Sequence, residues 1–234
     1  MIPGPFAREV LTIIKSLQDK LVKIGKADMV TTSVGSSVLG ASYPPSTGEF
    51  AANNLNDMKD VLRLLSAYGA PLMINVYPYY AYAADRSHVS LDYALFNATA
   101  PVVHDGELAY QNLFDAMVDS FYWAMEKAEY RNVSIVMSET GWPRTGTIPE
   151  VAETYSRNLV KRMKSGVGTP KRPNDTFGAF IYAYHDGPHD SFGVFDPNHT
   201  DRPFYAFPRR EAPVLPLCYN KVLLQSYVRL QKDK

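Results

Sequence analysis

Residues 134–143, Ser-Ile-Val-Met-Ser-Glu-Thr-Gly-Trp-Pro, join an apolar run to an abrupt polar end. The consecutive apolar residues at 135–137 are typical of a strand that is covered on both faces, as in a parallel sheet. Gly141 and Pro143 then stop the strand and leave Glu139 at its carboxyl end. Functional groups of parallel α/β folds collect at that end, so Glu139 is a candidate catalytic carboxylate.

Helices and strands alternate on both sides of this stretch. Apolar residues at three- and four-residue steps predict helices at 6–24, 54–69, 112–130 and 151–166. Apolar or β-branched runs predict strands at 29–39, 71–82, 134–139 and 177–184, and a short strand or turn at 90–96. The alternation favours parallel βαβ units, and the absence of a Gly-rich phosphate loop favours a barrel over a nucleotide-binding sheet. An eight-stranded (β/α)₈ barrel would be incomplete with these four strands.

Composition excludes several classes of protein. The 24 basic and 24 acidic residues balance, so no net field favours a nucleic acid or an anionic membrane as partner. One cysteine, Cys218, excludes an internal disulfide, and the histidines lack the spacing of metal ligands, so no metal or cofactor is expected. No 18-residue apolar run and no signal peptide is visible, yet four N-glycosylation sequons, at Asn97, Asn132, Asn174 and Asn198, suggest a secretory history.

Aromatic and amide residues surround the predicted strand ends. Asn75 and Tyr77 come at the end of one strand, and Trp142 follows Glu139 closely. A carboxylate flanked by Tyr and Trp is a composition that suits sugar rings. The simpler alternative is that Glu139 caps a loop or pairs with an Arg. Glycoside hydrolysis usually employs two carboxyl groups, one as proton donor and one as nucleophile, so a second acid should lie nearby.

Several motifs in one order give a specific resemblance. NVYPYYAY, LDYALF, YQNLFDAMVDSFYWAMEKA, VMSETGWP and GTPKRP resemble plant endo-1,3-β-glucanases of glycoside hydrolase family 17, over about residues 6–195. The resemblance implies a (β/α)₈ barrel, a retaining mechanism without metal or cofactor, and 1,3-β-glucan as substrate. It also implies that Glu139 is the nucleophile and that Asn75, Tyr77 and Trp142 bind substrate.

The chain departs from the family's pattern at two places. The family's proton donor is the Glu of a V-G-N-E segment, and no such segment occurs in these 234 residues. The F-[DN]-E-N-x-K segment of the family is replaced by residues 184–189, Tyr-His-Asp-Gly-Pro-His, where Asp186 is the best substitute acid. We therefore expect an incomplete TIM barrel, roughly strands 5 to 8 with their helices, in residues 1–205, followed by a divergent tail at 206–234.

These departures leave more than one function open. The first hypothesis is a family 17 endo-1,3-β-glucanase that is impaired or inactive because the general-acid segment is absent. The alternative is a truncated product that binds glucan or a partner without catalysis. Unpaired barrel edges would favour self-association. Family members are typically secreted to the cell wall or vacuolar, but without a visible signal peptide the compartment of this chain stays unknown.

Overall fold

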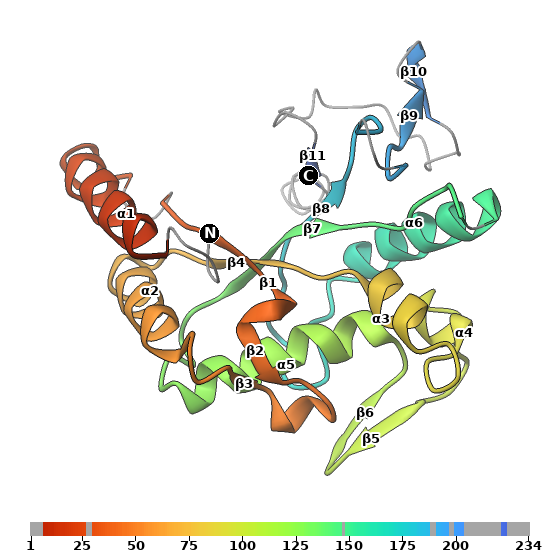
Figure 1. Cartoon of the computed structure of the whole chain (residues 1–234), viewed down its shortest axis with the longest axis horizontal. Coiled ribbons are helices and arrows are strands. Elements are labelled where there is room, and N and C mark those ends of the chain that lie inside the picture. The colour runs from red at the N-terminus through yellow and green to blue at the C-terminus, as the bar shows by residue number, and fades with distance from the viewer. Residues whose placement is uncertain are drawn as a thin grey trace. The chain divides into compact units, whose positions relative to one another are not determined.

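The computed structural model describes residues 7–26, 30–146, 148–187, 191–196, 199–203 and 221–223. It has an α/β fold with a parallel sheet (Figure 1). The chain divides into two compact units. Unit 1 comprises Met1–Val76, Asp105–Glu107 and Ala116–Ser138, and unit 2 comprises Tyr77–His104, Leu108–Asp115 and Glu139–Lys234.

Unit 1 is built on three neighbouring strands, β1 (Ser33–Gly35), β4 (Leu72–Asn75) and most of β7 (Ile135–Thr140). β1 and β4 run parallel, with Ser33 opposite Met73 and Gly35 opposite Asn75. Helices α1 (Ala7–Leu21) and α2 (Leu55–Tyr68) lie side by side in this unit (Figure 1). The unit's core is fully buried and includes Val34, Ile74, Met137, Leu62, Leu65, Phe121 and Met125.

The helices of unit 1 follow the apolar spacing predicted for them. α2 buries Met58, Val61, Leu62 and Leu65 on one face and ends at Gly69, whose φ of +65° suits glycine at a helix terminus. α1 continues into a 3₁₀ helix, η1 (Val22–Ile24), which also closes at a left-handed glycine. α5 (Leu113–Lys127) begins in unit 2 and lies mainly in unit 1. Helix α6 (Pro149–Lys164), in unit 2, also matches its prediction.

Unit 2 contains α6, α3 (Pro78–Ala84), α4 (Leu91–Ala94) and strand β8 (Ala179–Tyr182). β11 (Lys221–Leu223) pairs antiparallel with β8, with Lys221 opposite Tyr182. A small antiparallel pair is formed by β9 (Phe195–Asp196) and β10 (His199–Pro203). Within the divergent tail expected at 206–234, residues 221–223 are therefore a strand, and residues 206–220 and 224–234 lie outside the described chain.

Two predicted strand segments are helical. The strand predicted at 71–82 ends at Asn75, and α3 begins at Pro78. Proline fixes φ near the helical value and needs no intrahelical N–H at the first helical position, so it starts a helix here. The strand or turn predicted at 90–96 is α4, because the Ser90 side chain accepts a hydrogen bond from the Tyr93 amide at 3.3 Å and caps the helix.

The strand predicted at 29–39 was too long. Its described part ends at Gly35, where a 3₁₀ helix, η3 (Ser36–Val38), turns the chain into β2 (Leu39–Ala41). β2 pairs antiparallel with β3 (Glu49–Phe50) across a loop that contains the 3₁₀ helix η4 (Pro45–Thr47). β-branched residues favour extended backbone, but tertiary context decides where that backbone joins a sheet.

Residues 103–110 form a hairpin. β5 (Val103–Asp105) and β6 (Leu108–Tyr110) form it, and Gly106 adopts φ +59° in the turn. The Asp105 carboxylate accepts hydrogen bonds from the backbone N–H and the hydroxyl of Ser46, both at 2.6 Å. This acid thus anchors a neighbouring loop of unit 1.

Candidate functional site

A hydrogen bond between Tyr77 and Glu139 defines the candidate site in unit 2. Glu139 lies at the carboxyl end of β7, and Tyr77 is the residue immediately before α3. The Tyr77 hydroxyl donates to Oε2 of Glu139 at 3.1 Å. Tyr77 lies in the short link between the end of β4 at Asn75 and the start of α3 at Pro78. The site therefore depends on the start of α3 at Pro78, within the segment 71–82 that was predicted as a strand.

The protonation of Tyr77 follows from its surroundings. Burial raises the pKa of the Tyr77 hydroxyl far above its usual value, and the Glu139 carboxylate beside it raises that pKa further. Tyr77 is consequently a neutral hydrogen-bond donor at any physiological pH. A donor of this kind orients a carboxylate without adding a positive charge.

Aromatic rings enclose Tyr77. The centroid of its ring lies 5.4 Å from that of Tyr80, 5.7 Å from Phe192 and 6.4 Å from Tyr182. The Phe192 and Tyr182 rings meet that of Tyr77 edge to face, a favourable geometry for aromatic pairs. Phe192 is buried, whereas Tyr80 is 56% exposed. Tyr80 thus offers an accessible aromatic face close to the Tyr77–Glu139 pair.

Trp142 lies behind this cluster. Its side chain is only 2% exposed and packs against Tyr79, Tyr82 and Tyr155 at centroid distances of 5.3, 5.7 and 5.6 Å. In this structure Trp142 therefore supports Tyr79 and leaves little surface for a ligand. Gly141 next to it has no room for a side chain, because a Cβ would lie 2.3 Å from the carbonyl oxygen of Tyr182. The glycine allows the strand end to approach Tyr182 closely.

Asn75 belongs to a hydrogen-bond network in unit 1. Its Oδ1 accepts from the hydroxyls of Ser138 and Ser33, and the Ser138 hydroxyl also lies 3.2 Å from that of Ser33. Ser138 is completely buried and precedes Glu139 in the chain. The network links β1, β4 and β7 within that unit, with Asn75 as the shared acceptor.

Asp186, the candidate substitute acid, is engaged in a different cluster. Its Oδ2 accepts from the Arg144 guanidinium, and its Oδ1 accepts from the Gly193 amide at 2.8 Å. Arg144 also donates through Nε to the Gly193 carbonyl at 3.2 Å. Asp186 therefore holds two loops together. Both oxygens of its carboxylate are therefore occupied within this cluster.

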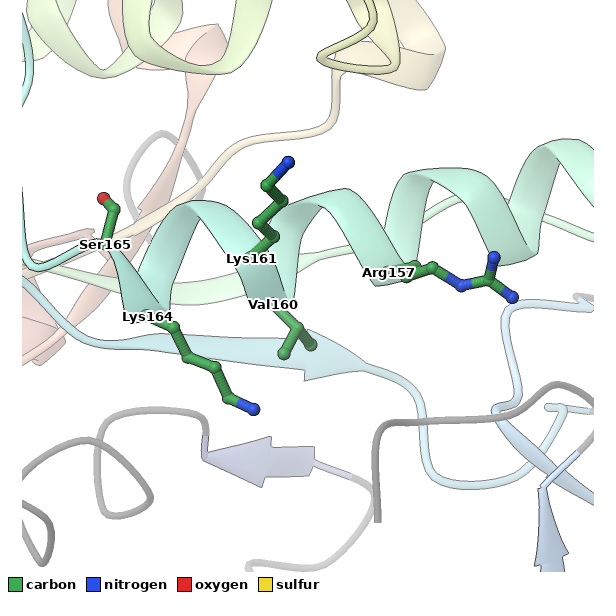
Figure 2. A pocket seen from close by; sticks show the side chains of 5 residues that line it. All are labelled: Arg157, Val160, Lys161, Lys164 and Ser165. Carbon is green, nitrogen blue, oxygen red and sulfur yellow. The ribbon is translucent and has the colours of Figure 1, made fainter. Parts of the chain in front are cut away.

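Other described features do not add to this site. No group of three metal-ligating side chains occurs in the described ranges, and no helix there is long and apolar enough to cross a membrane. A hollow of about 480 Å³ on α6 is lined by Arg157, Val160, Lys161, Lys164 and Ser165 (Figure 2). These lining residues include three cations and no carboxylate, so the hollow supplies neither of the two carboxyl groups that glycoside hydrolysis usually employs.

Sequence reasoning missed two members of the aromatic cluster. Tyr182 ends the observed strand β8, two residues before the end of the strand predicted at 177–184, so the rule that strand ends carry function pointed to Tyr184 instead. Phe192 lies between segments without regular periodicity, and nothing in its neighbourhood marks it as part of the site.

Fold and site define an α/β protein with a carboxylate among aromatic rings at a strand end. The profile of the glycosyl hydrolases family 17 matches residues 8–206, and the chain belongs to this family. The chain is 42% identical over 215 residues to a probable glucan endo-1,3-beta-glucosidase, BG4, of Arabidopsis thaliana, covering 88% of this chain and 62% of that protein. It is 38% identical over 207 residues to Lichenase-2 of Hordeum vulgare, covering 84% and 65%.

The chain is also similar to a solved structure over most of its length. CJP38, a beta-1,3-glucanase and allergen of Cryptomeria japonica pollen, superposes with a TM-score of 0.76 at 41% identity, covering 84% of this chain and 64% of that one. The chain spans about three fifths of the length of the Arabidopsis relatives that it matches.

Proposed function

We propose that the region around Glu139 is the nucleophile side of a retaining endo-1,3-β-glucanase site. The observation that carries the proposal is the hydrogen bond from Tyr77 to Oε2 of Glu139, in a chain of glycosyl hydrolase family 17. In a retaining reaction a carboxylate attacks the anomeric carbon and forms a glycosyl ester, which water then hydrolyses. Glu139 is that carboxylate, and Tyr77 fixes the position of one oxygen while the other attacks.

The aromatic residues supply the glucan contacts. Tyr80 is exposed beside Tyr77, so its ring can stack on the face of a glucosyl unit. Trp142 acts from behind by supporting Tyr79, because its own ring is buried. Asn75 links the strands of unit 1 through Ser138, the residue before Glu139. Trp142 thus holds Tyr79 in place within unit 2, Asn75 has a structural role within unit 1, and Tyr77 and Tyr80 contact sugar.

The described residues around Glu139 do not include a general acid that could protonate the leaving group. The V-G-N-E segment is not among the 234 residues, and both oxygens of Asp186 are occupied by Arg144 and Gly193. We infer that these residues correspond to an incomplete barrel, roughly strands 5 to 8, in residues 1–205, with 206–234 as a separate tail. A missing acid or base group typically costs 10²–10⁴-fold in rate.

The 234-residue chain is therefore expected to release reducing ends from laminarin at least about 10²-fold more slowly than a full-length family member. The measurement is a reducing-end assay at equal molar concentrations, with Glu139→Gln in parallel to reveal contaminating glucanase. Hydrolysis at the full-length rate that the Glu139→Gln change removes would show that the chain carries a working proton donor.

The alternative function is glucan binding without hydrolysis, which the exposed ring of Tyr80 favours. A pull-down on insoluble 1,3-β-glucan should retain the chain, and Tyr80→Ala should reduce retention several-fold. Tyr43→Ala is the matched control, because Tyr43 is an exposed tyrosine of unit 1. Equal retention of both variants and the parent would contradict a role of Tyr80.

We expect the chain to self-associate through unpaired edge strands of the incomplete barrel. Sedimentation velocity of the same sample should therefore show oligomers, and a sample that contains only monomer would contradict this expectation.

A further inference from the structure

Two of the four N-glycosylation sequons lie on exposed segments of unit 2. A sequon is Asn-X-Ser/Thr with X other than proline, and it accepts an oligosaccharide on the side-chain nitrogen of its Asn. Neither the glucan site nor the packing of the core accounts for these sequons. The Asn97 sequon follows α4, and the Asn174 sequon lies between α6 and β8.

The Asn174 sequon occupies the tip of a turn. The Asp175 amide donates to the Arg172 carbonyl at 3.1 Å, which closes a four-residue turn with Asn174 at its third position. Asn174, Asp175 and Thr176 are all exposed. Within the described ranges no hydrogen bond to the Asn174 side chain is formed. An attached sugar would therefore point into solvent without displacing a contact.

The Asn97 sequon presents an oriented amide. Oδ1 of Asn97 accepts a hydrogen bond from Nδ2 of Asn158 on α6 at 2.8 Å, and the Asn97 backbone N–H donates to the Asp92 carbonyl. Because Oδ1 is held, the amide plane is fixed. Among the described residues none accepts from Nδ2 of Asn97, the atom that a glycan would use. Asn97 and Thr99 are both exposed.

Asn132 offers a contrast in unit 1. It is exposed, but its Nδ2 donates to the Ser66 hydroxyl at 2.7 Å. A sugar on that nitrogen would have to share or displace this contact with α2. The Asn198 side chain lies outside the described residues. The side-chain geometry thus separates Asn97 and Asn174 from Asn132.

We propose that Asn97 and Asn174 are N-glycosylation sites that the folded chain accommodates. In the transfer, Nδ2 forms a bond to C1 of the first sugar of a lipid-pyrophosphate-linked oligosaccharide and loses one proton. The bond between C1 and the pyrophosphate oxygen breaks, and the lipid pyrophosphate leaves with the electron pair. The modification keeps Oδ1 free to accept, so the bond from Asn158 to Asn97 survives it.

Secretion of the full chain from yeast behind a cleavable signal peptide tests the proposal. Trimming with endoglycosidase H leaves one N-acetylglucosamine on each occupied Asn, and peptide mass mapping then locates the sites. The expected result is that most secreted molecules carry sugar at both Asn97 and Asn174. The free energy of unfolding of the trimmed chain should match that of the unglycosylated chain from bacteria.

Variants of the third sequon residue provide the control. Thr99→Ala and Thr176→Ala keep the Asn but remove the acceptor motif, so each should abolish sugar at its own site only. Thr99→Ser and Thr176→Ser should retain it. Secreted chains with unmodified Asn97 or Asn174 would overturn the assignment of that position, and a destabilised glycosylated chain would overturn the claim that the fold accommodates the sugar.

Discussion

Glu139→Gln is expected to abolish covalent labelling of the chain by 2-deoxy-2-fluoro-β-laminaribiosyl fluoride. Fluoride leaves without needing a proton from the protein, so the reagent tests the nucleophile independently of any proton donor. The 2-fluoro group slows hydrolysis of the ester, which lets it accumulate. An amide is a far weaker nucleophile than a carboxylate, and removal of a covalent nucleophile reduces rates by on the order of 10⁴-fold or more. Intact-protein mass spectrometry over time measures the loss.

Glu150→Gln is the matched control for this substitution. Glu150 is exposed in the first turn of α6, so the same chemical change there should leave labelling unchanged. Tyr77→Phe removes the hydrogen bond to Oε2 and should slow labelling without moving it to another residue, because hydrogen bonds to charged groups contribute about 1.5–3 kcal/mol. Labelling of Glu139→Gln at the parent's rate would place the nucleophile elsewhere.

Asp115→Ala should destabilise the chain by about 3–5 kcal/mol, because it leaves a mostly buried cation without its partner. The Arg162 guanidinium donates through Nε and Nη2 to both carboxylate oxygens of Asp115, at 2.9–3.2 Å. The two side chains are only 13% and 8% exposed. Arg162 also donates to the Val167 and Gly168 carbonyls, so the pair holds the last turn of α6 and the following loop against the start of α5. Chemical denaturation measures the free energy of unfolding.

Two comparisons sharpen this prediction. Glu153→Ala breaks the other Arg pair of α6, with Arg157, whose guanidinium side chain is 59% exposed; the expected loss is within about 1 kcal/mol. Asp115→Leu with Arg162→Met removes both buried charges and should recover much of the stability that Asp115→Ala loses. If Asp115→Ala lowered the free energy of unfolding no more than Glu153→Ala does, the buried Asp115–Arg162 pair would not be a main stabilising contact of unit 2.

The sequence predicted the long elements and the candidate nucleophile. Amphipathic spacing was sufficient for α1, α2, α5 and α6, and the apolar run before Glu139 was sufficient for β7. In each of these helices the apolar residues keep the helical spacing over many residues, and in β7 they form one continuous run. Glu139 was identified because it follows directly on such a strand and matches a family motif, although its catalytic role is still a proposal.

Elsewhere, single residues that start or cap a helix outweighed the secondary structure that the surrounding sequence favours. Pro78 starts a helix inside a run rich in tyrosine, which otherwise favours a strand, and Ser90 caps a helix of only four residues. The partners of Tyr77 could not be read from spacing, because Tyr182 and Phe192 lie more than a hundred residues along the chain. The burial of Trp142 also depends on residues far away in the chain, such as Tyr79 and Tyr82.

The most direct measurement is the location of the fluoro sugar on the unmodified chain. Trypsin releases residues 132–144 as one peptide, in which Glu139 is the only carboxylate side chain. We expect the added mass on this peptide, together with release of reducing ends from laminarin at least about 10²-fold more slowly than by a full-length family member. A label on a different peptide would contradict the proposal that Glu139 is the nucleophile. Laminarin hydrolysis at the rate of a full-length family member would contradict the proposal that these residues do not supply the proton donor.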